Sequence, residues 1–259
     1  KIIFITLSVI LLFARCDKSV KFSEDFDQYH DRTWINENFW SIPLEDWKIE
    51  NEKVECIGQR ANMRLNLLTY KTAGMGDYKA SVKMGISKEG QKEGAAGFRI
   101  GVKDDTDNDI RSVCYFGKGI DAGVDTRGFI FIDEKKKDIA AGYDLSEFDL
   151  TLEVTNYNEV KQVKLVFADK NGIKTELVNE NAGSTEGVVQ LVNNYKTGGN
   201  HPDIPLFWFD DIALSGSMVQ KVGENKFGPV LWSMYTLSEG TLKMTAQMPP
   251  LGDEGNRMV

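Results

Sequence analysis

Histidine and basic residues are scarce in this sequence. Of 259 residues, two are histidine, and 31 Lys and Arg stand against 39 Asp and Glu, for a net charge of −8. Binding of nucleic acid needs a basic patch, and this balance argues against one. His30 and His201 are too few for a two-metal hydrolytic site, which needs several His and Asp ligands. We therefore expect Gly199-Asn200-His201-Pro202 to be a loop, and we find no complete catalytic set.

Long apolar runs are also lacking. Ile2–Ala14 is too short to span a membrane but has the length of a signal-peptide core. Cys16 follows it, the order of a bacterial lipoprotein signal, in which Cys16 would carry the lipid. Phe13 and Arg15 depart from the usual Leu-Ala-Gly pattern, so cleavage nearby without lipidation is the alternative. Residues 1–16 predict an exported protein of the cell envelope, located in the periplasm or as an outer-membrane lipoprotein, in contact with a membrane only through a lipid anchor.

Cysteine is scarce too, and two residues remain besides Cys16. Export would make a disulfide between Cys56 and Cys114 chemically possible. Cysteines on apolar strands are more often simply buried, and their geometry cannot be read from sequence. Two buried thiols are the expectation, and a bridge is the alternative.

Helix signals are nearly absent, because only Leu145–Phe148 could form a helical turn. Apolar and polar residues alternate instead, which is typical of strands with one buried face. Turn signals separate these segments, and Asn171-Gly172 is a tight hairpin signal. The pattern predicts an all-β fold, a two-sheet antiparallel jelly-roll sandwich over residues 18–216. The predicted strands include residues 61–67, 80–86, 96–102, 150–154, 163–167, 188–192 and 206–214.

The composition changes after Gly216. Residues 217–225 are a polar linker, and two further strands are predicted at residues 227–235 and 241–248. Two strands alone are marginal in water. We therefore interpret residues 217–259 as a linker and the truncated start of a second small β domain.

The segment from 206 to 214 contains a carboxylate among apolar neighbours. Leu206, Trp208, Ile212 and Leu214 share one face at period two, and Asp210 lies between them. A buried carboxylate is costly unless it is paired, hydrogen-bonded or metal-bound. We expect Asp210 to be buried or nearly so, satisfied by backbone donors or by a cation. If a bulge falls at this pair of acids, Asp211 becomes the inward one.

The cation alternative involves four acids. Glu24 and Asp27 lie near the first strand, and Asp210 and Asp211 near the last; these strands are commonly neighbours in a jelly roll. Converging carboxylates would suit a structural Ca²⁺, whereas solvated acids are the alternative. The acids at 104–109 lack the Gly and the terminal Glu of a calcium loop, so a solvated hairpin tip is expected there.

Two further groups of side chains suggest carbohydrate chemistry. Trp34, Trp40 and Trp47 could form a platform for stacking sugars, or could plug the open end of the sandwich. The carboxylates Glu147, Asp149 and Glu153 share one face of a strand, as the acid and nucleophile of a retaining glycosidase would. In the laminarinase-type pattern Glu-x-Asp-x-x-Glu, however, the last Glu comes one residue earlier, so a solvated strand face is expected.

The opening FSEDFD, the polar-out strands and the closing FWFDDIALSG resemble the concanavalin A-like lectin/glucanase jelly roll in its laminin-G-like form. Residues 191–251, with LVNNYKTGG and FGPVLWSMYTLSEGTLKMTAQMPPLG, resemble the amino-terminal region of exported bacterial proteins of the alkaline phosphatase D (PhoD-like) family. That resemblance implies a downstream metallophosphoesterase core, whose catalytic residues have no counterparts in these motifs.

Two functions remain open. The first is a non-catalytic accessory β-sandwich of an exported, lipid-anchored metallophosphatase that hydrolyses phosphomonoesters or phosphodiesters. The second is a free-standing carbohydrate-binding or glucanase-like jelly roll, with glycans as partners.

Overall fold

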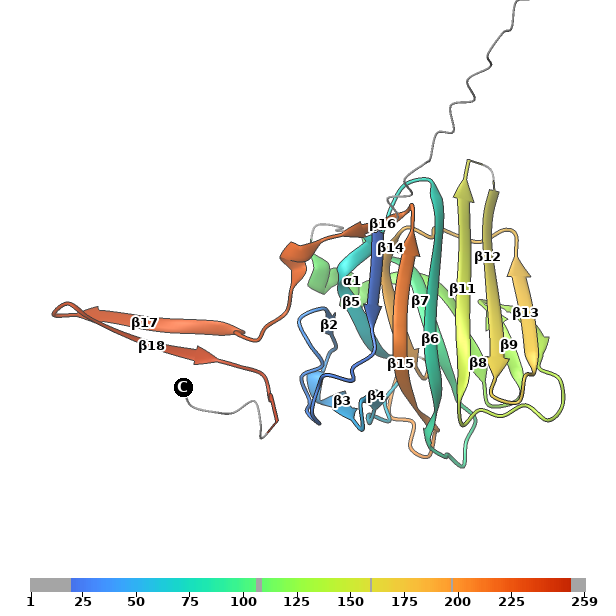
Figure 1. Cartoon of the computed structure of the whole chain (residues 1–259), viewed down its shortest axis with the longest axis horizontal. Helices are drawn as coiled ribbons and strands as arrows, with labels where there is room; N and C mark the ends of the chain where they lie inside the picture. Colours follow the sequence, from blue (N-terminus) through green and yellow to red (C-terminus); the bar gives the residue numbers. More distant parts are fainter. Residues whose placement is uncertain (1–19, 106–108, 159, 197, 253–259) are drawn as a thin grey trace, which may run out of the picture.

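The protein is a sandwich of two large antiparallel sheets, with a two-stranded hairpin beside it (Figure 1). The computed structural model describes residues 20–105, 109–158, 160–196 and 198–252, so the predicted signal segment and Cys16 lie outside the described residues. The predicted all-β sandwich is confirmed. Within the described ranges, no helix is long and apolar enough to cross a membrane.

The first sheet has the strand order β13-β12-β11-β6-β15-β4-β3, and β1 also pairs with β15. Between β12 and β13, the Asp169 carboxylate accepts the backbone N–H groups of Asn171 and Ile173, and Gly172 adopts φ +83°. The tight turn predicted at Asn171-Gly172 is therefore confirmed. The strands are β1 (Val20–Glu24), β3 (Trp47–Glu50), β4 (Lys53–Cys56), β6 (Gly76–Lys88), β11 (Phe148–Tyr157), β12 (Val160–Asp169), β13 (Lys174–Asn179) and β15 (Leu206–Gly216).

The second sheet has the order β10-β9-β8-β7-β14-β5-β16, and β2 pairs with β5. The strands are β2 (Phe39–Trp40), β5 (Met63–Thr72), β7 (Ala95–Lys103), β8 (Lys118–Asp125), β9 (Phe129–Ile132), β10 (Lys135–Asp138), β14 (Gly187–Asn193) and β16 (Val219–Lys221). Two short 3₁₀ turns, η1 (Leu44–Asp46) and η2 (Gly223–Asn225), lie in the connections.

A single α-helix, α1 (Ile110–Phe116), connects β7 to β8 in the described chain. Asp109 caps it by accepting the backbone N–H of Arg111 at 2.9 Å. Val113 of α1 packs on Val102 and Val188, apart from the main core. The helix therefore covers part of the second sheet, where the acids around 104–109 predicted only a hairpin tip.

The core fills the space between the sheets, and β15 contributes to it through both halves of its length. Phe207 and Phe209 are fully buried in this core, and so is Trp47, whose ring lies 5.7 Å from that of Phe209. Such aromatic pairs bury much apolar area and add a geometric preference to the packing.

A β-bulge divides β15, because its register with β6 shifts between Asp210 and Ala213. Phe207 and Phe209 belong to the core before this point, and Ile212 and Leu214 after it. Leu206 and Trp208 are buried, but the prediction that they share the inner face with Ile212 and Leu214 was wrong, since one extra residue exchanges the faces. Trp208 instead lies against Lys53, whose Nζ is 4.0 Å from the ring centroid.

The two acids at the bulge have different environments. Asp210 is half-buried, and its Oδ1 accepts the backbone N–H of Asp211 at 2.8 Å. Burial raises the pKa of Asp210, which that hydrogen bond partly offsets. Asp211 adopts φ 47°, is exposed and binds Lys83 Nζ at 2.6 Å. Asp210 thus has a backbone donor as expected, whereas the inward position considered for Asp211 was wrong.

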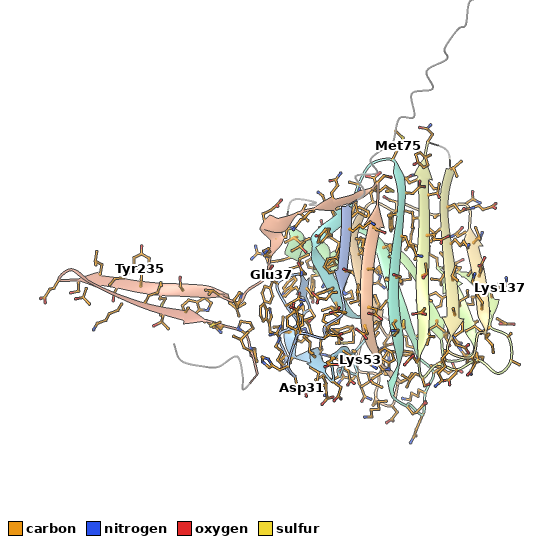
Figure 2. The ribbon with its side chains drawn as sticks, in the orientation of Figure 1. Asp31, Glu37, Lys53, Met75, Lys137 and Tyr235 are labelled. Carbon is orange, nitrogen blue, oxygen red and sulfur yellow. The ribbon has the colours of Figure 1, made fainter. Side chains whose placement is uncertain are left out.

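The hairpin of β17 (Trp232–Ser238) and β18 (Thr241–Gln247) projects away from the sandwich (Figure 1). Every residue of both strands is exposed, and Figure 2 shows Tyr235 far from the side chains of the sandwich. The two ends of the hairpin are bound to the first loops: Phe227 N–H donates to the Glu37 carbonyl, and Trp34 N–H to the Pro250 carbonyl.

Candidate functional site

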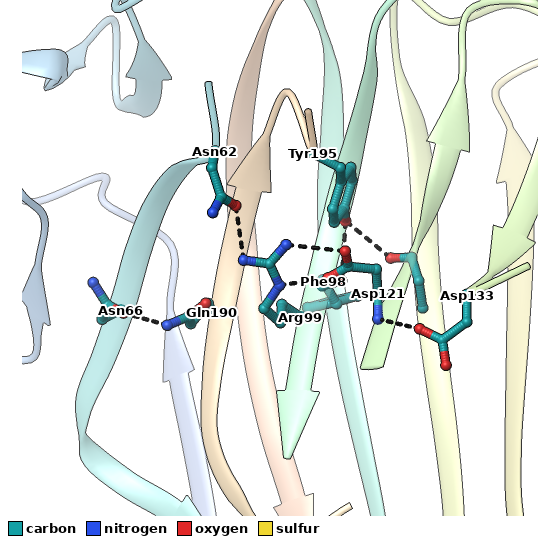
Figure 3. Close-up of polar contacts among 9 residues, drawn as sticks. Asn62, Asn66, Phe98, Arg99, Asp121, Asp133, Gln190 and Tyr195 are labelled. Carbon is teal, nitrogen blue, oxygen red and sulfur yellow. Dashed lines mark hydrogen bonds and ion pairs between the residues drawn. The ribbon is translucent and has the colours of Figure 1, made fainter. Parts of the chain in front are cut away.

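The outer face of the second sheet carries a row of polar side chains. Asn66, Gln190, Arg99 and Asp121 are register neighbours on β5, β14, β7 and β8. Because side chains directly opposite one another point to the same face, these four stand side by side across the sheet (Figure 3). Gln190 Nε2 donates to Asn66 Oδ1 at 2.7 Å.

Arg99 is the most strongly bound member of the row. Its side chain is only 9% exposed, and Nη2 donates to Asp121 Oδ2 at 2.9 Å while Nε donates to Oδ1. Nη1 donates to Asn62 Oδ1 at 2.7 Å. Burial alone would lower the pKa of Arg99, but the hydrogen bonds and charge of Asp121 outweigh it and the pKa is raised. Arg99 is therefore a positively charged side chain held in a fixed position at the middle of this face.

Tyr195, which follows β14, lies over the neighbouring strands. Its hydroxyl donates to the Phe98 carbonyl at 2.9 Å and lies 3.3 Å from the Ala122 carbonyl (Figure 3). A Cβ on Gly123 would lie 2.3 Å from the Ala96 carbonyl oxygen and 3.0 Å from this hydroxyl, so a glycine there lets both the neighbouring strand and the ring lie close. Burial raises the pKa of Tyr195 well above its ordinary value, which keeps the hydroxyl neutral.

A cleft of about 480 Å³ lies on this face beside Tyr195, and we name it the aromatic cleft. Ile130 and Ile132 of β9 belong to the core, so Phe129 and Phe131, which alternate with them, face outward into the cleft. Phe131 contacts Tyr195 edge to face, with centroids 5.2 Å apart. The residues lining the cleft are Glu93, Gly94, Ala95, Asp125, Arg127, Phe129, Phe131, Asp133, Lys136, Asn194, Tyr195 and Lys196.

Charged groups surround the aromatic floor. The guanidinium carbon of Arg127 lies 4.9 Å from the centroid of the Phe129 ring, and Nζ of Lys136 lies 4.7 Å from it. Arg127 also donates to Asp125 Oδ2 at 2.7 Å and lies 3.3 Å from Glu93 Oε2. The cleft thus offers flat apolar rings with exposed hydrogen-bonding groups around them, and its volume is in the range of small-ligand sites.

The three tryptophans do not come together as one exposed platform. Trp47 is in the core. Trp40 is half-buried, and its ring lies 6.2 Å from that of Phe227, while Trp34 Nε1 donates to the Phe227 carbonyl at 3.3 Å. Trp34 and Trp40 therefore pack where the hairpin joins the sandwich.

The four proposed calcium ligands lie near the paired strands β1 and β15, as expected from the jelly roll. Glu24 is buried and accepts Asn36 Nδ2 at 2.7 Å, and burial raises the pKa of Glu24. Asp27 is exposed. Within the described segments, no group of three or more His, Cys, Asp or Glu residues is placed to hold a metal ion. The calcium site stays a prediction.

Glu147, directly before β11, and Asp149 and Glu153 on β11 are all exposed, and Glu153 Oε2 lies 3.6 Å from Lys164 Nζ. They form the solvated face that was expected. His201 lies in a loop, where its Nε2 contacts the Gly198 carbonyl at 2.8 Å.

Cys56 on β4 and Cys114 on α1 are both buried and are not bonded to each other. Burial raises the pKa of Cys114 to about 12 and that of Cys56 still further. The expectation of two buried thiols is therefore confirmed.

Comparison with known proteins finds similarity in structure and not in sequence. No family model and no curated protein matches the chain. Peanut lectin bound to a nine-residue peptide superposes with a TM-score of 0.50 at 10% identity, covering 79% of this chain and 99% of that one. The fold is the concanavalin A-like jelly roll. Bauhinia forficata lectin in complex with GalNAc (TM-score 0.50, 11% identity, 77% and 99% covered) has it as well. So has winged bean acidic lectin complexed with methyl-α-D-galactose (TM-score 0.50, 13% identity, 79% and 100% covered).

Proposed function

We propose that this domain binds carbohydrate in the aromatic cleft. The observation that supports this most is a ligand-sized cleft floored by Phe129, Phe131 and Tyr195 and bordered by carboxylate, amide and cationic groups. A sugar ring has an apolar face that can lie on an aromatic ring, and hydroxyl groups that need donors and acceptors around it.

The rim has the groups that such hydroxyls need. Glu93 and Asp133 supply acceptors, and Arg127 and Lys136 supply donors, all with exposed side chains. Asn194 donates its Nδ2 to the Arg60 carbonyl, which orients the amide beside the cleft. Two structural neighbours are named as complexes with galactose-type sugars, which is consistent with a lectin-like role for this fold.

A glycan array followed by calorimetric titration of the best-bound oligosaccharide tests the proposal. Phe129→Ala should weaken binding at least about tenfold, a loss of 1.4 kcal/mol or more, because it removes the half-buried ring between Arg127 and Lys136. Tyr157→Ala is the matched control, since this 47% exposed aromatic lies on β11 of the other sheet. Equal affinity of Phe129→Ala and wild type, or an array with no bound glycan, would contradict the proposal.

A second role, as the accessory sandwich of a longer exported phosphatase, is supported by the hairpin. Tyr235 pairs with Met244 and Leu237 with Leu242 on one face, and all four side chains are at least 60% exposed. A continuous apolar patch of this kind usually marks an interaction site. A PhoD-like core of the same polypeptide, with a lipid on Cys16 anchoring the whole to the envelope, would supply that partner.

The gene sequence after Val259 tests this second role. A following region rich in Asp, His and Asn motifs would support it, and an immediate stop codon would contradict it. The mass of the mature protein from its native host tests the anchor, since an acylated Cys16 adds the mass of its lipid chains.

A further inference from the structure

A second cleft, of about 490 Å³, lies on the same outer face, and we name it the arginine cleft. It adjoins the aromatic cleft through two contacts. Asn194, which lines the aromatic cleft, donates to the carbonyl of Arg60, which lines the arginine cleft. Asn62 of the arginine cleft accepts from Arg99, whose guanidinium carbon is 5.9 Å from the Tyr195 ring centroid. The two clefts are therefore neighbours, linked through Asn194 and Arg99.

Arg64 is the unusual charge in the arginine cleft. It is half-buried on β5, and Nη2 donates to the Tyr115 carbonyl of α1 at 3.1 Å. Within the described ranges it makes no ion pair with a carboxylate, whereas Arg60 is paired with Asp46 and Arg99 with Asp121. Burial and the nearby positive charge of Arg99 both lower the pKa of Arg64. A buried charge is costly to leave without a partner, and among the described residues no carboxylate pairs directly with this guanidinium, so an anionic group of a ligand could pair with it.

The register of the strands connects Arg64 with the floor of the aromatic cleft. Arg64, Val192, Gly97, Gly123 and Phe131 are successive neighbours on β5, β14, β7, β8 and β9. Four steps between strands span roughly 19 Å, which is longer than a single sugar ring. Between its ends the row contains the buried Val192 and two glycines, Gly97 and Gly123, and the Tyr195 ring lies over Gly123.

We propose that the glycan bound by this face is an acidic oligosaccharide. One of its sugars occupies the aromatic cleft, and the carboxylate or sulfate of another binds Arg64 in the arginine cleft. This inference rests on the proposed carbohydrate-binding function and adds the class of its ligand. A guanidinium group suits it, because its planar donors match the oxygens of carboxylate or sulfate.

The test is calorimetric titration of the full chain with matched ligands. A tetrasaccharide of galacturonic acid is compared with its methyl ester, which has the same shape without the charge. A sulfated galactosaminoglycan tetrasaccharide and its desulfated form are the second pair. Wild type should bind the charged member of at least one pair about tenfold more tightly or better, and the pair that responds distinguishes carboxylate from sulfate.

Variants assign that preference to Arg64. Arg64→Gln should reduce the preference to about twofold or less while the affinity for the uncharged ligand is kept, and Arg64→Lys should retain part of it. Arg111→Gln is the matched control, because this side chain on α1 is 76% exposed. Thermal melts of each variant ensure that only folded protein is compared.

The results separate the two proposals. If wild type binds both members of each pair equally and Phe129→Ala abolishes binding, the carbohydrate site stands and the acidic ligand is refuted. If Arg64→Gln lowers the affinity for charged and uncharged ligands equally, Arg64 does not discriminate between them and the inference fails. If none of the glycans on the array or in the two pairs binds, both proposals fail.

Discussion

Removing the Asp121 carboxylate should be among the most destabilising changes on the outer face of the second sheet. Asp121→Ala leaves the Arg99 guanidinium, with a side chain only 9% exposed, without its counter-ion. Breaking a buried ion pair in this way costs about 3–5 kcal/mol. Asp121 itself is 27% exposed, so water can partly replace it and we expect the lower end, about 3 kcal/mol.

Urea unfolding followed by tryptophan fluorescence measures this loss as a shift of the midpoint at constant slope. Asp121→Asn should cost less, about 1–2 kcal/mol, because the amide oxygen still accepts a hydrogen bond. Glu153→Ala is the matched control: its ion pair with Lys164 also joins neighbouring strands, but both side chains are at least 30% exposed. Such exposed pairs contribute about 0–1 kcal/mol.

The double variant Arg99→Met/Asp121→Leu should recover most of the stability lost in Asp121→Ala, because neither charge is then left unpaired. A cost below about 1 kcal/mol for Asp121→Ala, equal to that of Glu153→Ala, would refute the reasoning. It would show that water solvates Arg99 and that the polar row is not a tightly bound network.

Two further predictions concern buried groups. Burial raises the pKa of Glu24, so its contribution to stability is present below the ordinary value of 4.5 and is lost as pH rises through the folded-state pKa. Glu24→Gln, which is neutral at every pH, should therefore unfold at higher urea than wild type at pH 7, with an advantage that disappears below about pH 4; an advantage independent of pH would contradict this assignment. Neither Cys56 nor Cys114 should react with a thiol reagent in native protein, and both should react in urea without reductant, because burial raises their pKa values and no disulfide joins them. Peptide mapping that finds Cys56 or Cys114 unlabelled in urea would contradict two free thiols.

Local alternation was sufficient to predict most strands, because side chains of a strand alternate between faces whatever its partners are. The segments at 80–86, 150–154 and 163–167 all lie within strands of the first sheet, with their apolar residues in the core. The turn at Asn171-Gly172 was predictable for the same reason, since its geometry depends on those residues themselves.

The faces of β15 were not determined locally. The bulge at Asp210 and Asp211 follows from pairing with β6 and from the positive φ of Asp211, so alternation along the strand alone assigned Trp208 to the wrong side. Likewise α1, which covers the second sheet, is only seven residues long and too short to show a helical period.

The candidate site depended still more on tertiary structure. Arg99 and Asp121 are 22 residues apart, and Gln190 is 124 residues from Asn66, yet strand pairing places all four in one row. The sequence by itself determined that these polar residues alternate with core residues on their strands. Only the order and register of the strands decided which of them would meet, because hydrogen bonding between strands joins segments that are distant along the chain.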